Sequence, residues 1–165
     1  EVLVCCSPLG QRLVQRLPLR TLVGFQAFRF GPELFLHVGH VEGSLPHQMT
    51  WPPIGRNVDV LVAAFALALY AMPARLESKL VVWTFALFGF GSLLNILATA
   101  LVSLAHPLRD RLAPSFEAGL EAVAFPPYVL LPGFLFQCAL AGHLLLFRRL
   151  LWPPRGGDGQ LYELT

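Results

Sequence analysis

Five polar side chains recur along one apolar stretch of the chain, at Gln26, Arg29, Glu33, His37 and His40. Successive members are three, four, four and three residues apart. At 100° per residue on an α-helix, all five fall within an arc of roughly 80°. The chemistry that this pattern suggests is protonation of Glu33 or His37, coupled to the binding of a small solute or to the passage of a proton.

A second stripe repeats this spacing in weaker form, at Ser92, Asn95, Thr99, Ser103 and His106. These side chains also fall within roughly 80° of one another on a helix. We expect the two stripes to enclose a buried polar chamber that opens outward, with Asp59 at the level of His40 and His106. The predicted chamber residues are Gln26, Arg29, Glu33, His37, His40, Asp59, Asn95, Thr99 and His106.

Two other interpretations of these residues stay open. Arg29 and Glu33 could pair on one helix face, and the stripe would then only hold helices together, at about 0.6–2 kcal/mol for each polar contact. Alternatively His37, His40 and His106 could ligate a metal or haem, because imidazole suits zinc, copper and iron. No cofactor is otherwise expected. We interpret His143 as an interfacial residue at the inner side of the membrane.

No residue is predicted to be catalytic, and the sequence favours a non-enzyme over an enzyme. It has no Gly-rich phosphate loop after a strand and no GxSxG motif. A formal net charge of +2 does not favour nucleic acid as a partner. The expected partners are the lipid bilayer, a small solute or proton, and other membrane proteins or further copies of the chain.

The stripes lie within apolar segments that are typical of membrane helices. Hydrophobic residues make up 55% of the chain and charged residues 13%, whereas soluble domains carry about 25% charged residues. Such a chain has too little polar surface for a water-facing globule. Four segments, at residues 22–40, 58–72, 80–105 and 123–147, predict an all-α, multi-pass transmembrane bundle of about four spans.

The basic residues predict the orientation of these spans. Eight lie on one side of the four-span topology and three on the other, which places both termini in the cytoplasm. Residues 1–21 would be a cytoplasmic basic segment, or the end of a truncated upstream span. Residues 22–152 would be the membrane domain, and residues 153–165 a disordered cytoplasmic tail.

The connection between the first two spans is rich in apolar residues and proline. Residues 41–56 include Met49, Trp51 and three prolines. We expect this segment either to fold over the outer mouth of the chamber as a lid, or to rest on the membrane interface with Trp51 as its anchor.

A resemblance covers about a fifth of the chain, from Gln26 to Asp59. The segment is similar to the pattern QxxR, ELxLH, EG, PxQMT and GRNxD of uncharacterised bacterial polytopic inner-membrane proteins. The matching positions include Gln26 and Arg29, Glu33 and His37, and Asp59. The resemblance implies a multi-pass protein of the bacterial inner membrane, and it implies no activity, since none is established for that family.

Overall fold

The computed structural model describes residues 7–104 and 106–152, in which every regular element is helical. The all-α prediction is therefore confirmed for this part of the chain. The predicted disordered tail lies outside the described residues. The elements are α2 (Pro8–Arg16), α3 (Leu19–Phe25), η1 (Gln26–Arg29), α4 (Phe30–Val41), η2 (His47–Met49), α5 (Asp59–Ala71), η3 (Pro73–Glu77), α6 (Lys79–Leu104), α7 (His106–Leu112), η4 (Leu120–Ala124), η5 (Leu131–Leu135) and α8 (Phe136–Leu151).

The first predicted segment is one helical run, α3–η1–α4, whose centre tightens into a 3₁₀ turn at Gln26–Arg29. Pro32 follows in the first turn of α4 and has no N–H to donate to the carbonyl of Phe28. The missing α-helical bond explains why the backbone adopts the tighter spacing there. The turn carries Gln26 and Arg29, two of the predicted chamber residues, so its geometry determines where their side chains lie.

Helices α3, α5, α6 and α8 share one apolar core. Val62, Ala66 and Phe85 are fully buried within it, and Leu146 of α8 joins them. Within the described residues, two helical stretches are long and apolar enough to cross a membrane, α6 with 26 residues and Leu131–Leu151 with 21. Helix α5 is shorter, at 13 residues.

The last helical stretch begins later than the sequence suggested. The prediction placed its start near residue 123, but the long helix starts at Leu131 with a π-helical turn and continues as α8 to Leu151. Residues 120–124 form the short η4 instead. Pro126 and Pro127 explain the delay, because each lacks the N–H that a continuing helix needs. After α6 the chain turns into α7, so His106 opens a further helix.

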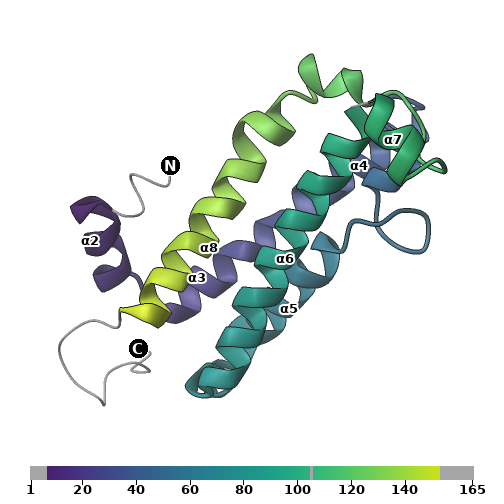
Figure 1. Cartoon of the computed structure of the whole chain (residues 1–165). Helices are drawn as coiled ribbons and strands as arrows, with labels where there is room; N and C mark the ends of the chain where they lie inside the picture. Colours follow the sequence, from purple (N-terminus) through teal and green to yellow (C-terminus); the bar gives the residue numbers. More distant parts are fainter. Residues whose placement is uncertain (1–6, 105, 153–165) are drawn as a thin grey trace.

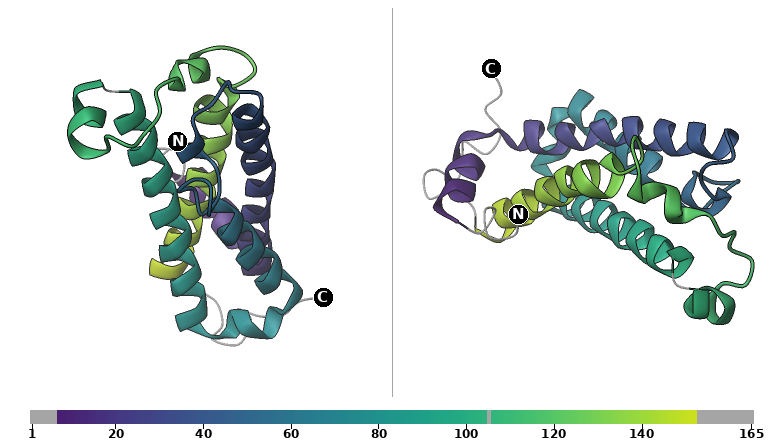
Figure 2. Two further views of the ribbon diagram at one scale, coloured as in Figure 1. Left: turned by 90° about the vertical axis from the view of Figure 1, so that its right-hand side faces the viewer. Right: turned by 90° about the horizontal axis from the view of Figure 1, so that it is seen from above.

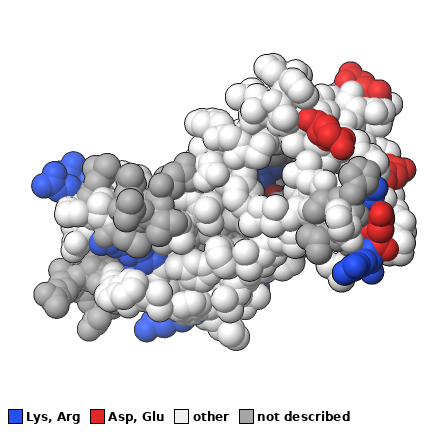
Figure 3. Space-filling view, turned by 45° about the horizontal axis from the view of Figure 1, so that its top comes forward, with Lys and Arg blue, Asp and Glu red and all other residues white. Residues whose placement is uncertain are grey.

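The helix ends gather at two opposite poles of the molecule. Figures 1 and 2 show α2, the start of α3, the α5–α6 connection and the end of α8 toward one pole, and α7, η2 and η4 toward the other. At the first pole the Nη1 of Arg149 donates to the carbonyl of Leu17 at 3.1 Å, and the Nε of Arg20 to that of Tyr70 at 3.0 Å. On the face in Figure 3, charged side chains concentrate toward these poles, and the band between them is uncharged apart from one hollow.

Candidate functional site

The buried guanidinium of Arg29 ties three elements together. Its Nη2 donates to Oδ1 of Asp59 at 2.7 Å and its Nε to Oδ2 at 3.2 Å, so the first turn of α5 holds it by both carboxylate oxygens. Its Nη1 donates to the carbonyl oxygen of Gly89 in α6 at 3.2 Å. Arg29 is 1% exposed. Such a two-pronged pair fixes the relative position of the helices as well as neutralising the charges.

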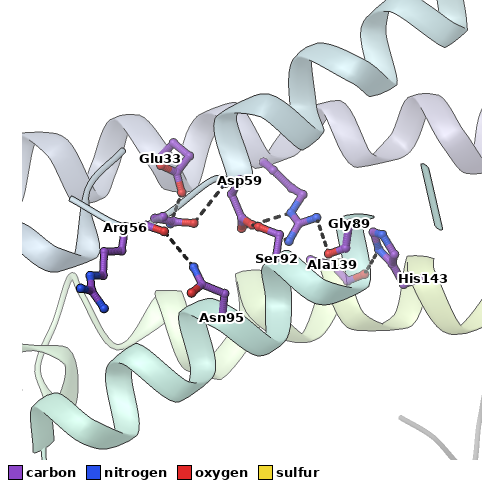
Figure 4. Close-up of polar contacts among 10 residues, drawn as sticks. Glu33, Arg56, Asp59, Gly89, Ser92, Asn95, Ala139 and His143 are labelled. Carbon is purple, nitrogen blue, oxygen red and sulfur yellow. Dashed lines mark hydrogen bonds and ion pairs between the residues drawn. The ribbon is translucent and has the colours of Figure 1, made fainter. Parts of the chain in front are cut away.

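Asp59 is the centre of this network, as Figure 4 shows. Besides Arg29 it accepts a hydrogen bond from the hydroxyl of Ser92. Its own N–H donates to Oδ1 of Asn57 at 3.1 Å, so Asn57 holds the backbone at the residue where α5 begins. The expected level of Asp59 was wrong: it lies beside Arg29 and Ser92 instead of with His40. The reason is that α5 begins deep between the helices, next to the 3₁₀ turn.

Glu33 lies one helical turn beyond Arg29 and is 1% exposed. Its Oε1 accepts a hydrogen bond from the side-chain amide of Asn57. Its Oε2 has no hydrogen-bond partner among the described residues. Arg29 interacts electrostatically with both Glu33 and Asp59, but its ion pair is with Asp59. The pairing of Arg29 with Glu33 along one helix face is therefore not what the structure has.

A cavity of about 340 Å³ borders these groups. Arg29, Glu33 and Asp59 contribute to its wall, as does Gln137. The remaining lining is apolar and comes from η1, α4, α6, η4, η5 and α8, with Met49 contributed by η2. The hollow in Figure 3 has blue and red atoms within an otherwise white surface, in keeping with this lining. A concave apolar site with a few converging polar groups is the usual form of a small-molecule pocket.

Helix α8 adds His143, which was predicted to lie at the membrane interface. That interpretation was wrong, because His143 is fully buried and its Nδ1 lies 3.2 Å from the carbonyl oxygen of Ala139. Its Nε2 faces the Cα of Gly89, the same residue whose carbonyl binds Arg29. The missing side chain of Gly89 was the available signal, because a small residue on α6 permits a ring from α8 to approach closely.

The connection after α4 closes one end of the cavity. Gln48 is buried; its Nε2 donates to Ser103 Oγ at 3.0 Å and to the carbonyl oxygen of Glu117 at 2.9 Å. The backbone N–H and the Nδ1 of His47 lie 2.9 Å and 3.1 Å from Oε2 of Glu117. These two bonds lower the pKa of the Glu117 carboxyl below its usual value. With Met49 in the cavity wall, this arrangement favours the lid interpretation of the segment.

The other predicted site residues divide between the network and its edge. Asn95 donates from Nδ2 to the carbonyl oxygen of Arg56 at 2.8 Å, which anchors the loop before α5. Thr99 is buried, and its carbonyl accepts from Ser103. Gln26 is buried, and its side-chain amide has no hydrogen-bond partner among the described residues. It sits where a side chain on Gly142 of α8 would otherwise be.

The predicted metal ligands make other contacts. His37 stacks on Trp51, with 4.4 Å between ring centroids, and the Nδ1 of His40 lies 3.3 Å from the carbonyl oxygen of Leu45. The side chain of His106 lies outside the described residues. Among the side chains that are described, no three of the His, Cys, Asp or Glu residues come together as a metal-binding group. The set of His37, His40 and His106 therefore stays a prediction.

Comparison with known proteins gives a family but no activity. No curated protein and no solved structure matches the chain. The family model described as Domain of unknown function (DUF8737) matches residues 2–151, which is most of the chain. This agrees with the expectation of a family without an established activity. The chain therefore belongs to the family described as Domain of unknown function (DUF8737).

Proposed function

We propose that the chain is a multi-pass protein of the bacterial inner membrane, with four spans and both termini in the cytoplasm. The spans would be α3–η1–α4, α5, α6 and η5–α8. Two of these stretches have the length and apolar composition of a span. Charged side chains concentrate toward two opposite poles and leave a largely uncharged band between them, which supports the same arrangement. Helix α5, at 13 residues, would need local thinning of the bilayer or help from its flanks.

Within this bundle, the cavity beside Glu33 would be a binding chamber for a small solute. The observation that carries the proposal is the buried carboxylate of Glu33, which lines the cavity and has Oε2 unpartnered among the described residues. An ionisable group at membrane depth is costly unless it is paired or functional. Arg29 and Asp59 satisfy each other and would position Glu33, whose protonation would be coupled to binding.

Two tryptophan substitutions on α6 test whether the cavity holds a molecule. Ala100 lines the cavity, whereas Ala98 is exposed on another face of the same helix and does not line it. Both variants and the wild type would be purified in mild detergent, and small molecules extracted from each would be quantified by mass spectrometry. Size-exclusion profiles and thermal unfolding would first establish that both variants are folded.

We expect one molecule near stoichiometric amount in the wild type and in Ala98→Trp, and its loss in folded Ala100→Trp. An equal content of that molecule in Ala98→Trp and Ala100→Trp would contradict the chamber, as would a wild type that carries no stoichiometric molecule. In either case the polar network would be better explained as a set of contacts that hold the helices together.

A further inference from the structure

The mouth of the cavity lies between α6 and η5–α8, the two stretches of the described chain that are long and apolar enough to span a membrane. Helices α6 and α8 are in contact where Gly89 meets His143, and the right-hand view of Figure 2 shows them separating toward the pole that carries α7. Three cavity-lining leucines on α6 are surface-exposed at this separation, Leu97 at 40%, Leu101 at 56% and Leu104 at 45%. In a bilayer such a rim faces hydrocarbon, so a ligand would reach the cavity sideways from the lipid.

The length and polarity of the lining indicate the shape of the apolar part of that ligand. Along α6 the wall runs from Leu93 to Leu104, about 16 Å at 1.5 Å per residue. Over this length α6 contributes apolar side chains alone, and η4 adds Leu120 and Val123 at the far end. The volume of about 340 Å³ is at the small end of ligand pockets. A single unbranched apolar chain fits a slot that is long, narrow and open to lipid.

The charged residues at one end of the cavity indicate the charge of the ligand's head group. Arg29 contributes one positive charge, and Asp59 and Glu33 contribute one carboxylate each. Because Asp59 binds both prongs of Arg29, the charge left over belongs to Glu33. Its Oε1 is taken by Asn57, which leaves Oε2 for a partner that is not part of the described chain. A cationic hydrogen-bond donor would satisfy this atom and bring the three charges to balance.

We propose that the cavity binds a single-chain amphiphile with an ammonium head, taken up laterally from the bilayer, with the head at Glu33 and the chain along α6. This inference rests on the proposed function and specifies its ligand. On binding, Glu33 accepts a hydrogen bond from the ammonium group as a carboxylate. Without the ligand, a proton on Glu33 would remove the unbalanced charge.

Three photoreactive probes with the same dodecyl chain and diazirine separate the contribution of the head from that of the chain. They carry an amine, an alcohol or a carboxylate, and would be added to the purified protein in nanodiscs of uncharged lipid. Saturable labelling is measured by intact mass, and the labelled residues by peptide mapping. The variants are Glu33→Gln, Ala100→Trp, and the exposed control Glu121→Gln, whose side chain does not line the cavity.

We expect the amine to label residues 93–104 of the wild type saturably and with higher affinity than the alcohol, and the carboxylate not to label them. Glu33→Gln should weaken amine binding by about tenfold to a hundredfold while the alcohol binds as before. Glu121→Gln should match the wild type, and Ala100→Trp should lose both probes.

Two failures of this experiment would have different meanings. If all three probes label the cavity equally and Glu33→Gln changes nothing, the ammonium assignment is overturned but a binding chamber stands. If no probe labels residues 93–104 saturably, or if labelling is unchanged in Ala100→Trp, the amphiphile is overturned. The extraction experiment then decides separately whether the cavity binds another kind of molecule.

Discussion

The close approach of α8 to α6 at Gly89 gives a sharp test of the helix packing, the substitution Gly89→Ala. A Cβ at Gly89 would lie 2.2 Å from Nε2 of His143, 2.8 Å from its Cε1, and 3.1 Å from a methyl group of Val62. His143 is fully buried, and its Nδ1 lies 3.2 Å from the carbonyl oxygen of Ala139. The ring therefore cannot retreat without losing that contact or moving α8.

Gly91 supplies a matched control, because a Cβ there meets nothing within 4 Å and the residue is exposed on the same helix. Overpacking a filled core costs typically about 1–3 kcal/mol. Replacing glycine by alanine in a helix gains up to about 1 kcal/mol when the space is free. Both substitutions share this gain, so we expect Gly89→Ala to be less stable than Gly91→Ala by the overpacking cost alone, about 1–3 kcal/mol.

The assay is reversible unfolding in mixed micelles, with SDS as denaturant and far-ultraviolet circular dichroism as the readout. The double variant Gly89→Ala/His143→Ala tests the cause, because removing the ring makes room for the new methyl group. Its loss of stability should be smaller than the sum of the single losses by about 1–2 kcal/mol. Equal stability of Gly89→Ala and Gly91→Ala, or an additive cycle, would refute the packing described here.

Two further predictions concern charges. Asp59→Asn removes the partner of buried Arg29, so it should cost about 3–5 kcal/mol in the same unfolding assay; a variant as stable as the wild type would show that the pair is not needed for folding. Hydrogen bonds from the N–H and Nδ1 of His47 hold the pKa of Glu117 below its usual range. Its carboxylate should thus stabilise the fold above about pH 4.3, and this contribution should vanish as the pH falls through the lowered pKa. Glu117→Gln should therefore be slightly less stable than the wild type at neutral pH, by less than about 1 kcal/mol, and the difference should disappear in acid; a constant difference would contradict this assignment.

The helical content could be predicted because it follows from local patterns. Apolar runs of spanning length produce helices wherever no proline interrupts them, and α5 and α6 begin and end within a residue of the predicted segments 58–72 and 80–105. The start of the last helix could not be placed as well. Pro126 and Pro127 signalled a disturbance, but only the packing of η4 into the apolar cluster with Leu36 and Met49 decides where the helix resumes.

The site was predictable as two stripes but not as a set of partners. Helical spacing indicated that Arg29 and Glu33 share a face with Gln26, and all three are buried. Helical spacing could not indicate that Arg29 binds Asp59 and Gly89. Those contacts depend on the axial positions of α5 and α6 relative to the α3–η1–α4 run. His143 was missed for the same reason: its burial is set by the crossing of α6 and α8 at Gly89.

The contacts that depend on helix register distinguish residues that stabilise the fold from residues available to bind a ligand. Arg29 and Asp59 neutralise each other's charge, and their contacts join three elements. Substituting either residue should therefore first lower the free energy of unfolding. Glu33 is different, because Asn57 engages one oxygen and the other has no partner among the described residues. Removing its charge takes no ion pair away from the fold. A neutral Glu33→Gln should therefore leave stability near that of the wild type and alter only what the cavity binds, a separation that a purely structural stripe would not produce.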